Sequence, residues 1–163
     1  KHDHLVECVS EAPFVSDYGG EWIAKTYRNK VDGSVNIVLQ KGKVSPDQPT
    51  LVRMHGMSIF SDVLGAPGPR KRTLQRAMAE IGKAGAGVIV LLMPSEPEQL
   101  TREVGAATGR PPEMDLRNYG IGAQILADLG IHDMILLTNA HRNVVGIEGY
   151  GINIVGERPI PEA

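Results

Sequence analysis

The stretch DLRNYGIGAQILADLGIHDMILLTNAHRNVVGIEGYGINIVGERP, residues 115–159, decides the fold. Apolar side chains recur at helical spacing in its first part, at Ile121, Ile125 and Leu129. Gly130 suits the left-handed turn that ends many helices, and Met134–Leu137 is a short apolar run typical of a strand buried on both faces. We expect three further elements: a short unit over 142–147, a turn at Glu148-Gly149 and a strand over Ile152–Val155. This succession predicts α/β units.

The residues before this stretch predict a β-rich N-terminal third. Strand-like alternation occurs over residues 5–11, 21–28 and 34–40, and the next strand is expected over residues 50–55. Turn-forming residues separate the first three, at Pro13, Asp17–Gly20 and Asp32-Gly33, so we expect an antiparallel β meander. Three further elements are predicted: a helix over Arg70–Lys83, a buried strand over Val88–Leu92 and a helix over Pro94–Val104 capped by Ser95.

Together these elements predict a mixed α/β (α+β) fold. Its antiparallel, β-rich N-terminal third is followed by α/β units with a mixed sheet. The sequence contains no repeat, low-complexity tract or linker, so residues 1–163 are expected to form a single domain. Hydrophobic residues make up 42% of the chain, enough for a core, and aromatic residues only 4%, so aliphatic packing must dominate.

Composition excludes several classes of function. The net charge of −2 gives no electrostatic case for binding nucleic acid or an anionic membrane, and no apolar run approaches the length of a membrane span. Cys8 is the single cysteine and cannot form an internal disulfide, so we expect a cytoplasmic, reducing location. The sequence begins at Lys1 without an initiator methionine or a secretory signal, and we expect it to be part of a longer protein.

Three segments resemble the C-terminal part of GTP cyclohydrolase II: RNYGIGAQILADLG, LLTN and GIEGYGINIVGERPI. The resemblance is moderate around TLVRMHG and extends more weakly to Lys1. Members of this family use zinc to open the imidazole ring of GTP, at the start of riboflavin synthesis. Their domain is often fused behind a 3,4-dihydroxy-2-butanone-4-phosphate synthase. The resemblance therefore implies a GTP cyclohydrolase II-like fold, an attached synthase domain and a homodimer.

The resemblance fails where the family binds its metal. The family holds zinc with three cysteines, one after an Arg-x-His-Ser-Glu stretch and two in a later Cys-x-Cys-Gly. Here Ser58 stands where the first cysteine belongs, and the later pair falls within residues 66–71, which contain no sulfur. The remaining candidates share no ligand spacing: His55, His132 and His141. We therefore expect no zinc cofactor.

The nucleotide site is also incomplete. The family's Arg-Gln-Glu-Gly-Arg-Gly-Ile-Gly loop is replaced by residues 93–99, and a family lysine by Asn143. Four residues match family positions: Asp115 as proton acceptor, Arg117 as nucleophile towards the α-phosphate, and Arg53 and Thr138 as substrate contacts. Asp62 is a further retained position. A structural alternative is that Asp115 caps the following helix and pairs with Arg117.

These observations favour a GTP cyclohydrolase II-like domain that is catalytically inactive and that stabilises, dimerises or regulates an attached dihydroxybutanone phosphate synthase. Two alternatives stay open. One is an active cyclohydrolase that releases formate and pyrophosphate from GTP. The other is a nucleotide or flavin sensor. Under the favoured hypothesis, GTP or a phosphate group binds weakly through the four retained residues.

Overall fold

The computed structural model describes residues 4–106, 116–139 and 147–162. Within these residues, seven strands form one mixed sheet in the order β1-β2-β3-β5-β4-β6-β7. The strands are β1 (Val6–Ser16), β2 (Gly20–Asn29), β3 (Val35–Lys41), β4 (Thr50–Gly56), β5 (Gly87–Leu92), β6 (Asp133–Leu137) and β7 (Asn153–Arg158). The helices are α1 (Thr73–Ala84), α2 (Pro97–Ala106) and α3 (Leu116–Asp128), with the short turns η1 (Ile59–Val63) and η2 (Glu148–Tyr150). The predicted mixed α/β fold class is confirmed.

Strand pairing divides the sheet into an antiparallel and a parallel half. β1, β2 and β3 pair antiparallel in succession, and β3 pairs antiparallel with β5. β4 pairs parallel with β5 and β6, and β6 with β7. The meander is therefore right for three strands and wrong for the fourth, since β5 lies between β3 and β4. The reason is visible in β4 itself, where every residue is buried, as in a central strand, and α1 supplies the crossover that a parallel pair requires.

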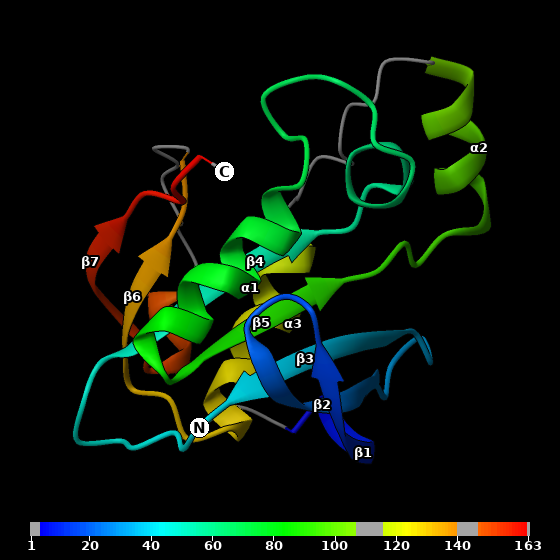
Figure 1. Cartoon of the computed structure of the whole chain (residues 1–163). Helices are drawn as coiled ribbons and strands as arrows, with labels where there is room; N and C mark the ends of the chain where they lie inside the picture. Colours follow the sequence, from blue (N-terminus) through cyan, green and yellow to red (C-terminus); the bar gives the residue numbers. More distant parts are fainter. Residues whose placement is uncertain (1–3, 107–115, 140–146, 163) are drawn as a thin grey trace.

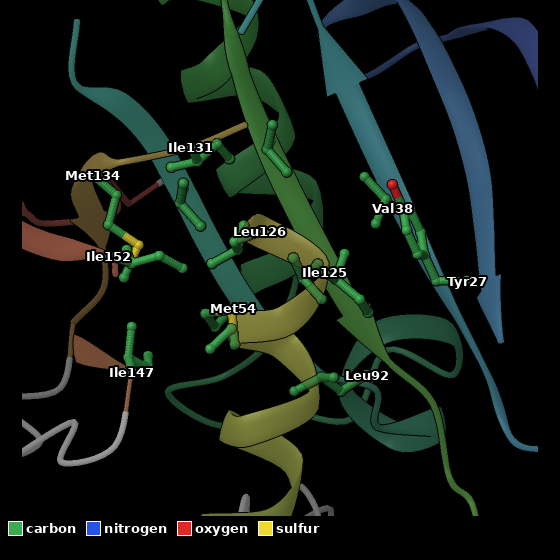
Figure 2. Packing of buried hydrophobic residues seen from close by; sticks show 14 of the residues in the cluster. Tyr27, Val38, Met54, Leu92, Ile125, Leu126, Ile131, Met134, Ile147 and Ile152 are labelled. Atoms are coloured by element: carbon green, nitrogen blue, oxygen red, sulfur yellow. The ribbon is translucent and has the colours of Figure 1, made fainter. Parts of the chain in front are cut away.

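One helix covers each face of the sheet. Figure 1 shows α1 in front of the sheet and α3 behind it, while α2 stands apart from both. Successive residues of β4 face opposite sides: Leu51 packs in the cluster that contains α1, and Val52 and Met54 pack in the cluster that contains α3. The α3 side holds the larger cluster, in which Ile125 and Leu126 meet side chains of β4, β5, β6 and β2 (Figure 2).

The ends of several elements differ from the sequence predictions. Pro13 does not form a turn but lies within β1, paired with Ile23, because β1 is an edge strand where a missing N–H is tolerated. α1 and α2 each begin three residues later than predicted, α2 at Pro97, so Ser95 is not adjacent to its first residue. The predicted end of α3 is confirmed, since Gly130 has φ 86° and its amide bonds the carbonyl of Ala127.

The C-terminal unit is confirmed where the structure describes it. A one-turn helix, η2, occupies the predicted turn at Glu148-Gly149, and β7 begins one residue after the predicted start of the last strand. Most of the predicted unit over 142–147 lies outside the described residues. No helix in the described part of the chain is long and apolar enough to cross a membrane.

Candidate functional site

The C-terminal half of β4 places two polar side chains on the α1 side of the sheet. Arg53 and His55 follow Leu51 at the two-residue period of a strand, so they share its face. Both are buried, with 7% and 1% of their surface exposed. The chain then turns back through η1, which brings the buried carboxylate of Asp62 onto the imidazole. A polar cluster thus occupies a position next to the apolar core.

The hydrogen bonds fix the tautomer of His55. Nε and Nη2 of Arg53 lie 3.2 and 3.0 Å from Nδ1 of His55. A guanidinium can only donate, so Nδ1 accepts and the ring proton is on Nε2. Nε2 in turn donates to the Asp62 carboxylate, at 3.1 Å from Oδ1 and 3.0 Å from Oδ2. The imidazole therefore links a buried cation to a buried anion while staying neutral itself.

The pKa values agree with this assignment. Burial, together with the positive charge of Arg53, holds the pKa of His55 below its ordinary value of 6.5, although Asp62 opposes the shift. Burial is also the main reason that the pKa of Arg53 falls to about 10, and the nearby charge of Arg70 contributes. Arg53 therefore stays charged at neutral pH and His55 stays uncharged.

Ser58 connects Asp62 to the helix α2. Its backbone amide donates to Oδ2 of Asp62 at 2.8 Å, and its hydroxyl donates to Oε1 of Glu103 at 2.8 Å. The hydroxyl oxygen also accepts from the amide of Ser61 at 3.4 Å, which caps η1. Ser58 is 1% exposed, and Glu103 is the buried residue of α2. Both polar groups of the serine are thus engaged within the protein.

We call the residues Arg53, His55, Ser58, Asp62 and Glu103 the buried polar cluster. Nη1 of Arg53 also lies 3.4 Å from the carbonyl of Leu137, and the Gln75 amide donates to the carbonyl of Asp62 at 2.8 Å. Each side chain of the cluster is hydrogen bonded to another member. This arrangement satisfies buried charges, and it holds β4, η1 and α2 together.

The structure describes only part of the predicted nucleotide site. Arg53 belongs to the buried polar cluster, and Thr138 follows β6, where its amide donates to the carbonyl of Arg158 at 2.9 Å. Asp115 and Asn143 lie outside the described residues, and Arg117 is described only through its backbone in α3. The convergence of Arg53, Thr138, Asp115 and Arg117 on one ligand therefore stays a prediction.

The residues around Ser58 do not fit a zinc ion. Zinc sites use cysteine thiolates, imidazoles or carboxylates, usually four in a tetrahedron or three with a water. Both ring nitrogens of His55 are committed, to Arg53 and Asp62, and the hydroxyl of Ser58 is bonded to Glu103. Among the described residues, no group of three His, Cys, Asp or Glu side chains is placed to hold a metal.

Cys8, the one thiol of the chain, lies several strands away from Ser58 in the sheet. It is exposed on the edge strand β1, whereas Ser58 follows β4. Four strand spacings separate β1 from β4 in the sheet, which corresponds to about 19 Å. His132 is exposed after α3, and His141 lies outside the described residues. These residues therefore do not complete a metal site at Ser58.

Sequence reasoning named four of the five residues of the buried polar cluster but predicted none of the contacts between them. Asp62 was noted only as a retained family position, and Glu103 was not singled out. Ser58 carried a partial signal, because serine is a preferred N-cap residue, although Asp62 follows it at four residues and not at the three of a capping box. Glu103 gave no such signal, since its partner lies 45 residues away in the chain.

Comparison with known proteins agrees with the fold and the resemblance. The family model described as GTP cyclohydrolase II matches residues 7–159. The riboflavin biosynthesis protein RibBA of Aquifex aeolicus is 35% identical over 178 residues, which cover 98% of this chain and 43% of that protein. The 3,4-dihydroxy-2-butanone 4-phosphate synthase of Pseudomonas aeruginosa is 35% identical over 164 residues, covering 97% of this chain and 44% of that protein.

A solved structure shows the same fold. RibBX of A. baumannii, described as a two-domain 3,4-dihydroxy-2-butanone 4-phosphate synthase, matches with a TM-score of 0.61 at 22% identity, over 99% of this chain and 41% of that one. The chain thus spans less than half of the length of these relatives. With a family model that matches nearly all of its residues, the chain belongs to the GTP cyclohydrolase II family.

Proposed function

We propose that this chain is a GTP cyclohydrolase II-like domain of riboflavin biosynthesis that does not open the GTP ring and that stabilises or regulates an attached dihydroxybutanone phosphate synthase. One observation carries the proposal. Ser58 stands where the resemblance implies a zinc ligand, and its hydroxyl and amide are both bonded to carboxylates of the protein, Glu103 and Asp62. A serine hydroxyl in this state is not a zinc ligand of the usual kind.

The chemistry of the family needs the metal for a specific step. Zinc lowers the pKa of a bound water from far above neutral pH to about 7, which makes a nucleophile available at neutral pH. The buried polar cluster supplies no substitute, because the imidazole that could act as a base already donates to Asp62 and accepts from Arg53. We therefore expect no ring opening of GTP.

The names of two relatives support a role beside a synthase. A P. aeruginosa protein that contains a region 35% identical to this chain is named for its synthase activity alone. The A. baumannii neighbour is likewise described as a two-domain synthase. In such proteins a second domain of this fold accompanies a synthase whose name mentions no cyclohydrolase. A homodimer and a cytoplasmic location belong to the same proposal.

Metal content and turnover test the first half of the proposal. The purified chain should contain far less than one zinc per molecule by elemental analysis, and it should form no diaminopyrimidine product from GTP with or without added zinc. The Cys8→Ser variant serves as a matched control, since it removes the only thiol. Stoichiometric zinc in both proteins, or product formation, would overturn the proposal.

A second measurement tests the role beside the synthase. The melting temperature and activity of a relative's synthase domain should both be lower when the cyclohydrolase-like domain is removed from the longer protein. Equal stability and activity with and without the domain would refute a stabilising or regulatory role. Light scattering of the longer protein at several concentrations checks the homodimer.

The family match over residues 7–159 favours one alternative, an active cyclohydrolase. It differs from the proposal in a single readout, because it requires release of formate and pyrophosphate from GTP. If GTP, pyrophosphate and FMN also give no heat in calorimetry at millimolar concentration, a nucleotide or flavin sensor is excluded as well.

A further inference from the structure

A hollow of about 260 Å³ opens at the start of α1, outside the buried polar cluster. Its walls come from the loop before the helix, from the first turns of the helix and from the C-terminal segment: Gly68, Pro69, Lys71, Arg72, Arg76 and Glu162. Three of these six residues are cationic and one is acidic. The hollow is therefore a basic recess on the surface, which we call the basic hollow.

The positive charge extends beyond the walls. Both Arg70 and Arg76 lower the pKa of Arg53, so their charges reach the buried polar cluster. Together with Arg70, which precedes Lys71 in the chain, the hollow and the cluster hold five cations: Arg53, Arg70, Lys71, Arg72 and Arg76. They hold three carboxylates: Asp62, Glu103 and Glu162. Five minus three leaves two positive charges, and the first turn of α1 adds no acidic residue.

The three cations of the hollow differ in how firmly the protein holds them. Arg76 is fixed by hydrogen bonds to the carbonyls of Pro161 and Lys71 and to the hydroxyl of Thr73. The Arg72 guanidinium lies 5.7 Å from the centroid of the Tyr18 ring, over its face. Within the described part of the chain, the exposed ammonium of Lys71 has no hydrogen bond or ion pair.

We propose that the basic hollow binds a small phosphate monoester. Two arginines and a lysine around one recess provide the charge-assisted donors that phosphate oxygens prefer, and arginine forks can bind two oxygens at once. The size argues for a small ligand, because pockets for larger molecules have volumes of roughly 300–1,000 Å³. The phosphate group enters beside Lys71 and Arg72, and Arg76 forms the fixed wall.

The described residues of the predicted nucleotide site lie outside this hollow. Neither Arg53 nor Thr138, which match family nucleotide contacts, lines the basic hollow. It lies instead in the segment where the resemblance places the two missing cysteines, at residues 66–71. The inference therefore holds whether or not the chain turns over GTP.

Calorimetry at low salt tests the proposal on the 163-residue chain. Ribose 5-phosphate should bind with a measurable heat, ribose should not, and inorganic phosphate should compete. Lys71→Ala and Arg72→Gly should each weaken binding about tenfold, as expected for the loss of one hydrogen bond to a charged group. Glycine suits position 72, whose φ is 60°, so this variant removes the cation without straining the turn.

Two further variants make the result decisive. Glu162→Gln should tighten binding, since it removes the one carboxylate from the walls. Lys83→Ala is the matched control, because this exposed lysine lies at the opposite end of α1, and it should leave the affinity unchanged. The proposal is overturned if ribose and ribose 5-phosphate behave alike at 10 mM, or if Lys71→Ala and Lys83→Ala bind equally well. Tighter binding of GTP than of ribose 5-phosphate, unaffected by Lys71→Ala, also contradicts it.

Discussion

Replacing Asp62 by asparagine tests the buried polar cluster with the smallest change of shape. In the protein, both carboxylate oxygens lie within 3.1 Å of Nε2 of His55, and Oδ2 also accepts from the amide of Ser58. An asparagine has one acceptor oxygen, so its NH₂ group faces either the imidazole N–H or the serine amide, donor against donor. The substitution also removes the negative charge that faces buried Arg53 through the imidazole.

The magnitude follows from these contacts. A hydrogen bond to a charged group contributes about 1.5–3 kcal/mol, and a buried donor without a partner costs about 1–3 kcal/mol. Because the asparagine oxygen still takes over one of the bonds, we expect the free energy of unfolding to fall by about 3 kcal/mol. For a chain of this length, the melting temperature should then fall by roughly 6–12 °C.

Urea denaturation at pH 7.5, followed by circular dichroism, measures this change. Asp47→Asn is the matched control, because Asp47 is exposed in the turn before β4, and its replacement should alter stability by less than about 0.5 kcal/mol. An equally small change in the free energy of unfolding for Asp62→Asn would refute the argument that the Asp62 carboxylate stabilises the cluster through its charge and its hydrogen bonds. An unchanged slope of the denaturation curve is needed for the comparison, since it shows that the denatured state is the same.

Three further predictions concern stability. The pKa of His55 lies below 6.5 in the folded protein, so on acidification the unfolded chain takes up the proton first. The contribution of His55 to the free energy of unfolding should therefore be complete above pH 6.5 and fall at lower pH. The fall should be at most about 1.4 kcal/mol per pH unit. His55→Gln should show a weaker loss over the same range in urea titrations. Gly82→Ala should destabilise the chain by about 1–3 kcal/mol, since a Cβ there would lie 2.5 Å from the Cα of Gly19. Gly105→Ala is the control, because the space around Gly105 is open, and it should stabilise α2 slightly. Thermal melts measure both changes. Addition of a chelator should leave the melting temperature unchanged, and a fall of many degrees would reveal a structural metal.

The sequence was sufficient for the local elements but not for their spatial order. Alternation in residues 21–28 and helical spacing in 121–129 are local patterns, so β2 was predicted close to its observed bounds and α3 close to its observed end, although α3 begins five residues before Ile121, at Leu116. The insertion of β5 between β3 and β4 was not predictable in the same way, because the pairing of Ile37 with Leu91 joins residues far apart in the chain. The central position of β4 is evident only from the structure, where every residue of the strand is buried.

The candidate site shows the same division. The loss of cysteines could be stated from the sequence, since it depends only on residue type. The hydrogen bonds that Arg53 and His55 make in this chain, which has no thiolates at this position, could not be stated from the sequence. The reason is that Glu103 and Ser58 meet across 45 residues and that Asp62 reaches His55 through the turn η1. Long-range hydrogen bonds carry no periodic signal in a sequence.

The charges around the start of α1 give the two proposals a common physical basis. A zinc ion in this region, as the resemblance implies for the family, would bring two positive charges balanced by three thiolates. In this chain the same segment brings Arg70 and Lys71 instead, and within the buried polar cluster the carboxylates of Asp62 and Glu103 accept from His55 and Ser58. Each charged side chain of the interior thereby has a hydrogen-bond partner, while the surface at Lys71 and Arg72 keeps an excess of positive charge. Hydrogen-bonded charges in the interior contribute to stability, as the proposed function requires, and the excess positive charge of the basic hollow is suited to an anion. If the chain regulates a synthase, a phosphate ester bound at this hollow would make that regulation depend on the concentration of the ester. Lys71→Ala should then remove the regulation while leaving the fold intact.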